Sequence, residues 1–204
     1  MIEIKSTPAV PTTEPEPAWE VALLFPAQGA WSEEEYLHLD TNHLVEFSHG
    51  HIEVLSMPSD KHQAIVGFLF VLLLHLARQT GGTARVAPLR LRLRPGKIRE
   101  PDLVFVASAL DPRRQAQFWT GADLVIEVVS PDDPQRDLVT KRAEYAQAGI
   151  PEYWIVDPQT ETITVLRLQD AAYAEHGVFG RGAVATSAYY PDLQAAVNDV
   201  LDAP

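Results

Sequence analysis

The sequence Arg-Glu-Pro-Asp-Leu-Val-Phe-Val at residues 99–106 and the sequence Asp-Leu-Val-Ile-Glu-Val-Val-Ser-Pro at residues 123–131 decide the fold. Each contains a short apolar run next to a proline or another turn residue, which is the pattern of a strand buried on both faces. Each also carries one carboxylate, Asp102 or Glu127, in otherwise apolar surroundings. We therefore expect two neighbouring buried strands, each contributing one acidic side chain.

These two carboxylates are candidate metal ligands. Side chains alternate between the faces of a strand, so Glu127 shares a face with Val125 and Val129. Asp102 follows Pro101, which cannot donate to a strand ladder, so we expect it at a strand entry that aims it into a cleft. A buried carboxylate must take up a proton or meet a cation, and Mg²⁺ is typically held by one or two carboxylates. Taken singly, each residue also has a structural interpretation, as a turn aspartate or as an arginine partner.

Lys141 is the candidate third member of this site. A helix predicted to run to Ala148, with Asp137 as its N-cap, presents Lys141 and Tyr145 on one face, because residues four apart are neighbours on a helix. Tyr145 has two interpretations: core packing, or a hydrogen bond that orders Lys141 or a phosphate. Glu46, between two apolar residues in a predicted hairpin at 44–56, is a further candidate.

Length and composition limit the class of protein. The chain has 204 residues, 46% of them hydrophobic, and no cysteine, so we expect one domain at 21–204 without disulfides or a cysteine-based metal site. Residues 1–20 are rich in Pro, Glu and Thr and predict a flexible arm without the apolar core of a signal peptide. A cytosolic location is the expectation. The net charge of −12 argues against a general nucleic-acid coat protein.

Basic residues are nevertheless concentrated just before Asp102. Residues 85–99 contain six of the 16 lysines and arginines, and the alternating run at 89–94 places Arg90, Arg92 and Arg94 on one face of a strand. These three arginines are candidate substrate-binding residues for a phosphate-bearing substrate. A solvated strand face explains the pattern equally well.

The remaining pattern predicts helices and strands in alternation. Helices are expected at 32–39, where Ser32 and Glu35 form a capping box, at 60–79, where Asp60 is the N-cap, and near 193–201. Strands are expected at 83–94, 98–107, 153–157 and 162–168. Residues 64–77 are almost entirely apolar, but they span only about 21 Å as a helix, which is short for a membrane crossing. This helix is predicted to lie in the core, and a homodimer that covers part of it is plausible. His62 and His75 are interpreted mainly as packing or surface residues.

Several of these segments together resemble the Uma2 family of restriction-endonuclease-like proteins, within the PD-(D/E)XK nuclease superfamily. The matching segments are 100–106, 124–131, Arg136-Asp137-Leu138, Lys141, Tyr145 and 149–157, and the resemblance covers about residues 30–200. It implies an α/β (mixed α+β) restriction-endonuclease-like core, in which a mixed sheet is flanked by helices, with an N-terminal helix and hairpin. It also implies that Asp102 and Glu127 bind metal and that Lys141 supplies the lysine role. The superfamily's usual lysine position, two residues after Glu127, is Val129 here.

The resulting hypothesis is a nuclease dependent on Mg²⁺ or Mn²⁺ that hydrolyses phosphodiester bonds in nucleic acid, most plausibly DNA. Asp102 and Glu127 would hold the metal, Lys141 would orient water or offset negative charge, and Glu46 would complete the metal shell. One alternative is an inactive nuclease-fold module that binds nucleic acid or a protein partner. Another is a hydrolase of a different phosphorylated substrate, because fold analogy is weak evidence for substrate.

Overall fold

A six-stranded mixed sheet forms the centre of the molecule. The structure, a computed structural model, describes residues 25–41 and 43–204, so the arm predicted at 1–20 lies outside the described residues. The strand order is β10-β9-β8-β7-β6-β3, with β7 and β8 parallel and the other neighbours antiparallel. The bounds are β3 Thr83–Val86, β6 Leu103–Val106, β7 Leu124–Val128, β8 Glu152–Asp157, β9 Thr162–Gln169 and β10 Ala172–Gly180. The predicted mixed sheet is confirmed.

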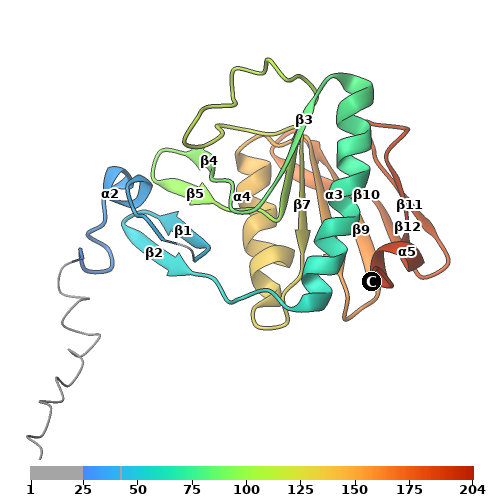
Figure 1. Cartoon of the computed structure of the whole chain (residues 1–204), viewed down its shortest axis with the longest axis horizontal. Coiled ribbons are helices and arrows are strands. Elements are labelled where there is room, and N and C mark those ends of the chain that lie inside the picture. Colours follow the sequence, from blue (N-terminus) through green and yellow to red (C-terminus); the bar gives the residue numbers. More distant parts are fainter. Residues whose placement is uncertain (1–24, 42) are drawn as a thin grey trace, which may run out of the picture.

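Helices cover both faces of this sheet (Figure 1). The long helix α3 (Asp60–Thr80) packs Ile65, Leu69 and Leu73 against one face, in a cluster that includes Ile126 and Trp154. The π-helical turn η1 (Arg136–Lys141) and helix α4 (Arg142–Gln147) cover the opposite face. Strand β7 is buried along its whole length because it lies between these two layers.

A smaller lobe stands at one side of the main body (Figure 1). Its sheet has the order β2-β1-β5-β4, and its core contains Trp31, Tyr36, Val45, Phe47 and Ile98. The bounds are α2 Glu33–Leu37, β1 Val45–Ser48, β2 His51–Val54, β4 Leu91–Arg94 and β5 Lys97–Arg99. The predicted capping box of Ser32 and Glu35 starts α2. At the other side of the body, β11 (Val184–Thr186), β12 (Gln194–Ala196) and α5 (Val197–Leu201) close the chain.

Two predicted strands are each divided between the two sheets. The expected strand at 83–94 is β3 and β4, and the expected strand at 98–107 is β5 and β6. The breaks fall at Pro88 and Pro101, because a proline cannot donate the hydrogen bond that a continuous strand needs. The two crossings lie side by side, with the Ala87 amide donating to the Asp102 carbonyl over 3.0 Å. Asp102 therefore lies at the junction of the sheets, at the strand entry that was predicted.

Helix starts differ from the predictions in two places. The N-cap of α3 is Ser59, whose hydroxyl accepts from the His62 amide, and not Asp60. Asp137 does not cap the helix before α4, because it lies inside the π-helical turn η1 and its carboxylate faces Lys141. The predicted C-terminal helix is shorter than expected, since residues 194–196 form strand β12.

By length and composition alone, α3 would be long enough to cross a membrane. Its buried side chains include Ile65, Leu69, Leu73 and Leu76, all of which pack into the core of the main body. A core helix meets the same two criteria, so α3 is described here as part of that core.

Candidate active site

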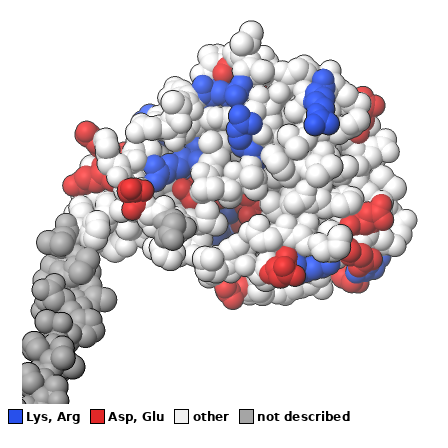
Figure 2. Space-filling model, viewed as in Figure 1, with Lys and Arg blue, Asp and Glu red and all other residues white. Residues whose placement is uncertain are grey.

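An open cavity of about 340 Å³ lies where the small lobe meets the main body. Figure 2 shows the hollow, with acidic and basic atoms at its floor. Its ionisable lining residues come from both lobes, and they are Glu53, His62, Glu100, Asp102, Glu127, Asp132, Asp133, Arg136, Asp137 and Lys141. The cavity is large enough for a nucleotide-sized ligand and strongly acidic at its base.

Asp102 and Glu127 meet in this cavity through the pairing of β6 with β7. Leu103 pairs with Ile126 in antiparallel strands. Asp102, which precedes Leu103, and Glu127, which follows Ile126, therefore lie at the same end of the two strands. The Asp102 amide donates to Glu127 Oε2 over 3.3 Å, and Asp102 Oδ2 accepts from the Val128 amide over 2.8 Å. Backbone groups of each strand thus orient the carboxylate of the other.

Lys141 reaches the same point from η1, although it is distant in sequence from both strands. Its ammonium nitrogen lies 2.9 Å from Glu127 Oε1, 3.1 Å from Asp137 Oδ1 and 3.9 Å from Glu46 Oε1. The Lys141 side chain is only 4% exposed, so these oxygens take the place of its water. The structure therefore brings the three predicted residues Asp102, Glu127 and Lys141 together.

Burial controls the protonation of the groups at the floor of the cavity. Asp102, Glu127 and Asp137 line it together with Lys141, and Arg136 is a second cation that pairs with Glu46 and Glu53. Burial raises the pKa of Glu127 to about 8, although Lys141 opposes this, and Asp102 and Asp137 raise it further. Burial also raises the pKa of Asp137. Burial opposes the charge on Lys141, but the surrounding carboxylates outweigh this and raise its pKa, so the lysine stays protonated.

Tyr145 and Glu46 lie behind this floor. Tyr145 is fully buried, and its hydroxyl donates to Glu127 Oε1 over 2.5 Å. The sequence suggested Lys141 or a phosphate as the hydrogen-bond partner of Tyr145, but the partner is Glu127. Glu46 is also buried and pairs with Arg99 and Arg136. Burial favours its neutral form, but Lys141 and these two arginines outweigh it and lower the pKa of Glu46 to about 2. Glu46 is therefore a permanent anion on the far side of Lys141.

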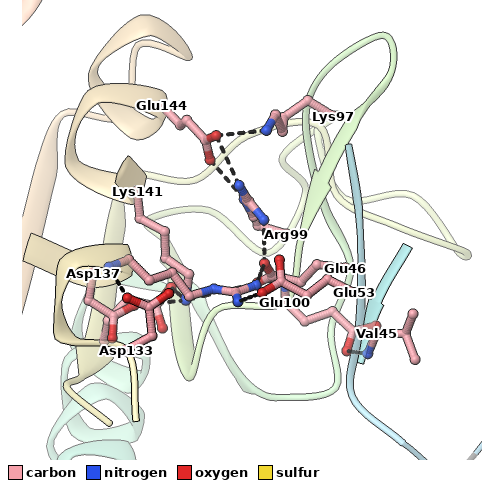
Figure 3. Close-up of polar contacts among 12 residues, drawn as sticks. Val45, Glu46, Glu53, Lys97, Arg99, Glu100, Asp133, Asp137, Lys141 and Glu144 are labelled. Carbon is pink, nitrogen blue, oxygen red and sulfur yellow. Dashed lines mark hydrogen bonds and ion pairs between the residues drawn. The ribbon is translucent and has the colours of Figure 1, made fainter. Parts of the chain in front are cut away.

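A buried network of ion pairs connects the small lobe to α4 (Figure 3). Arg99 donates to Glu46 over 2.5 Å and to both oxygens of Glu144, over 2.7 and 2.9 Å. Lys97 adds a contact of 2.7 Å to Glu144, and Arg136 pairs with Glu46 and Glu53. This network fixes the position of the lobe that forms one wall of the cavity.

Replacement of Arg99 tests the weight of this network. The Arg99→Met variant leaves the buried Glu46 and Glu144 short of a cation, which is expected to cost about 3–5 kcal/mol of unfolding free energy. Urea unfolding followed by circular dichroism measures it. Arg181→Met, which removes an arginine that pairs with Glu161 and Asp202 on the surface, is the matched control and is expected to change little. Equal losses in the two variants would show that the network carries no special weight.

Most of the basic residues at 85–99 are used inside the molecule. Arg90 donates to the carbonyls of Leu37 and Leu39, lies 3.6 Å from Glu100 and stacks on Tyr36. Arg92 pairs with Glu33 over 2.9 Å and stacks on Phe118. The described residues that line the cavity do not include Arg90, Arg92 or Arg94. The side-chain hydrogen bonds and ion pairs of Arg90 and Arg92 are therefore with residues of the small lobe, an arrangement that neither of the two interpretations from sequence included.

Two cavity residues were not selected from the sequence. Asp137 was assigned a capping role, yet its spacing of four from Lys141 is a signal that could have identified it. His62 was interpreted as packing, but its Nε2 lies 3.2 Å from Asp102 Oδ2. Burial opposes protonation of His62, whereas the hydrogen bond and charge of Asp102 outweigh burial and raise its pKa.

The donor set fits a hard divalent cation. Asp102, Glu127 and Asp137 line one cavity, and carboxylate oxygens are the ligands that such an ion prefers. Asp137 Oδ1 is buried without a well-directed hydrogen bond, despite the nearby Lys141 ammonium. In the described part of the chain, no three acidic or histidine side chains are already gathered as a metal-binding group. Lys141 lies between Glu127 and Asp137, which explains why their oxygens are apart.

Comparison with known proteins identifies the family. A family model described as "Uma2: Putative restriction endonuclease" matches residues 33–198. The chain belongs to the Uma2 family. A solved structure, described as a putative nuclease belonging to DUF820 from Anabaena variabilis ATCC 29413, is 24% identical with a TM-score of 0.71. The match covers 84% of this chain and 98% of that one, and it supports the fold. A search of curated proteins found no match. Membership in Uma2 confirms the resemblance read from the sequence and makes the chain a restriction-endonuclease-like protein.

Proposed function

We propose that this Uma2 protein is a nuclease that uses Mg²⁺ or Mn²⁺ to hydrolyse phosphodiester bonds in nucleic acid, with DNA as the substrate. The observation that carries the proposal is the group of three carboxylates around one buried lysine at the floor of an open cavity. Family membership supports the reaction class.

Each residue has a role that follows from its contacts. Asp102 and Glu127 would hold the cation, with Asp137 as a further oxygen donor facing the same space. When bound, the cation would supply Lewis-acid polarisation of the phosphate and a more acidic water ligand. Lys141, held by Glu127 and Asp137, would offset negative charge that develops on the phosphate oxygens.

The remaining residues position these groups. Tyr145 donates to Glu127 Oε1 and so fixes the rotamer of that carboxylate while leaving Oε2 toward Asp102. Glu46, instead of completing a metal shell, lies on the side of Lys141 that faces Arg99 and Arg136. It keeps Lys141 protonated and in place, which is a positioning role.

The first test is cleavage of plasmid DNA by the purified protein. Mn²⁺ or Mg²⁺ is expected to support cutting and a chelator to stop it. Asp102→Asn removes one anionic ligand, so we expect a loss of Mn²⁺ affinity in calorimetry and at least a tenfold loss of cleavage rate. Asp192→Asn, an exposed carboxylate far along the chain, is the control and is expected to behave like the parent.

Two results would contradict the proposal. Cleavage that survives in Asp102→Asn at the parental rate would remove Asp102 from the mechanism. No Mn²⁺ or Mg²⁺ binding by the parent protein would favour the non-catalytic module that binds nucleic acid or a protein. The internal ion pairs of Arg90, Arg92, Lys97 and Arg99 favour a protein partner within that second function, because they reduce the positive charge that is free to bind nucleic acid.

A further inference from the structure

A second hollow lies next to the catalytic cavity, along the edge strand β3. It has a volume of about 540 Å³, and its lining includes Arg85, Leu89, Leu110, Arg114 and Trp119. Arg85 is exposed, and the side chain of Leu110 is 92% exposed. Arg85 donates to the Ala84 carbonyl over 2.8 Å, and neither Arg85 nor Arg114 is among the described residues that line the first cavity.

The two hollows are continuous along the chain. Val86 and Ala87 line the catalytic cavity, while their neighbours Arg85 and Leu89 line the second hollow. Since residues in a strand rise about 3.4 Å each, Arg85 is at most about 7 Å from Ala87, which directly follows β3. The Ala87 amide donates to the backbone carbonyl of Asp102 over 3.0 Å, so this short segment connects the hollow with the backbone of Asp102.

The sheet register places Arg85 on the face that carries the catalytic carboxylates. Arg85 pairs with Val104, and Val104 pairs with Val125. Val104 is two residues from Asp102, and Val125 is two residues from Glu127, so all of them point to one side of the sheet. A strand of nucleic acid that enters the cavity over β3 would therefore meet Arg85 next.

Positive charge in this hollow is free for a ligand. Within residues 25–41 and 43–204, neither Arg85 nor Arg114 forms an ion pair with a carboxylate. Asp111 also lines the hollow, but Arg113 neutralises it at 2.5 Å, and the hydrogen bonds from Arg113 lower the pKa of Asp111. On the face of the molecule drawn in Figure 2, Lys and Arg side chains lie over the upper part and acidic side chains lie mainly at the margins.

The hollow is held in shape before any ligand binds. The backbone of Trp119 is tied to the small lobe by hydrogen bonds of 2.8 Å to the Arg90 carbonyl and 2.7 Å from the Arg92 amide. Arg114 lies over the Trp119 ring, 5.5 Å from its centre, and donates to the Ala109 carbonyl. Guanidinium groups held in this way lose little freedom on binding a phosphate.

We propose that this hollow binds the phosphodiester backbone of the nucleic-acid strand next to the scissile bond, with Arg85 and Arg114 as phosphate contacts. The inference rests on the proposed nuclease function and adds the path of the substrate. Leu89 and Leu110 provide apolar surface for a sugar or base beside the phosphate. Phosphate contacts of this kind position the strand without reading its sequence.

The experiment compares a long and a short phosphodiester in the parent, Arg85→Gln, Arg114→Gln and the double variant. A fluorescent 20-nucleotide DNA strand reports binding by anisotropy in Ca²⁺ and cleavage in Mn²⁺. Bis(4-nitrophenyl) phosphate reports chemistry at the cavity and has no second phosphate that could occupy the hollow. Arg167→Gln, an exposed arginine on β9, is the matched control.

The double variant is expected to bind the DNA strand about tenfold more weakly, with a higher KM for cleavage and little change in kcat. Each single variant should reduce the slope of log affinity against log salt by about 1. Hydrolysis of bis(4-nitrophenyl) phosphate should stay at the parental rate in every variant. Thermal unfolding confirms that the variants are folded.

The outcomes separate the two proposals. Unchanged affinity and salt slope in the double variant would overturn the strand path, whatever the enzyme does to either substrate. An equal loss with the short diester would also overturn it, because the arginines would then act on the cavity. Failure of the parent to hydrolyse either substrate would instead contradict the nuclease proposal, and the anisotropy comparison would still decide whether the hollow binds DNA.

Discussion

The Lys141→Met variant is expected to lose nuclease activity by a factor of about 10²–10³ and also to unfold more easily than the parent. The loss of activity follows because the ammonium that would offset charge on the phosphate is gone. The loss of stability follows because Glu127 and Asp137 are within 2.9 and 3.1 Å of Lys141 and are buried with it. Removal of the cation from such a group is expected to cost about 3–5 kcal/mol.

Two measurements check this prediction. Cleavage rates at saturating Mn²⁺ report the chemistry, and urea unfolding without metal reports the stability. Lys61→Met, at the exposed start of α3, removes a lysine of the same size and is expected to leave both nearly unchanged. A variant at Lys141 that cuts DNA at the parental rate would show that the ammonium has no part in the reaction.

Mn²⁺ should also restore much of the stability of Lys141→Met. A divalent cation bound to Asp102 and Glu127 would replace the lost positive charge at the floor of the cavity, and ligand binding to the folded state stabilises it. The Tm of Lys141→Met should therefore rise more with added Mn²⁺ than that of the parent. The same rise in both would indicate that Lys141 and the metal do not share the carboxylates.

The strands that carry the site could be predicted because their signal is local. Leu124 to Val128 is an apolar run with one carboxylate, and burial on both faces is the direct consequence of that composition. The division of 83–94 and 98–107 between two sheets could not be predicted in the same way. The alternation of apolar and basic residues at 89–94 continues the two-residue period of β3. Only the prolines at 88 and 101 mark the points at which the chain passes from one sheet to the other.

The site could be predicted in part for the same reason. Asp102, Glu127 and Lys141 each stand out from their neighbours in sequence, and the structure places them in one cavity. The roles of Arg90 and Arg99 depend on partners about 50 positions away, including Leu37 and Glu46, and a local pattern holds no information about such partners. The sequence pattern of an arginine-rich strand is therefore the same whether its arginines face a nucleic acid or distant residues of the same protein.

Glu127→Gln is expected to have the opposite effect on stability from Lys141→Met while also abolishing metal-dependent cleavage. Burial raises the pKa of Glu127 to about 8, above the value of about 4.3 for an unfolded carboxyl group. Between these values the folded state keeps a proton that the unfolded state has released. The contribution of Glu127 to the unfolding free energy is therefore fully present below about pH 4.3 and is lost as the pH rises toward 8.

Glutamine cannot ionise, so it removes this loss. Without metal, the Glu127→Gln variant should be at least as stable as the parent at pH 8, and its unfolding free energy should fall less between pH 5 and pH 8. Its amide oxygen can still accept from Tyr145 and face Lys141, so the floor of the cavity keeps its shape.

Two carboxylates then remain, and Mn²⁺ affinity measured by calorimetry should fall at least tenfold. The ionised Glu127 carboxylate would thus be a cost to the metal-free fold at pH 8 and a requirement for binding the cation. A Glu127→Gln protein that is less stable than the parent at pH 8 would contradict this argument, because it would mean that the carboxylate is already compensated without metal.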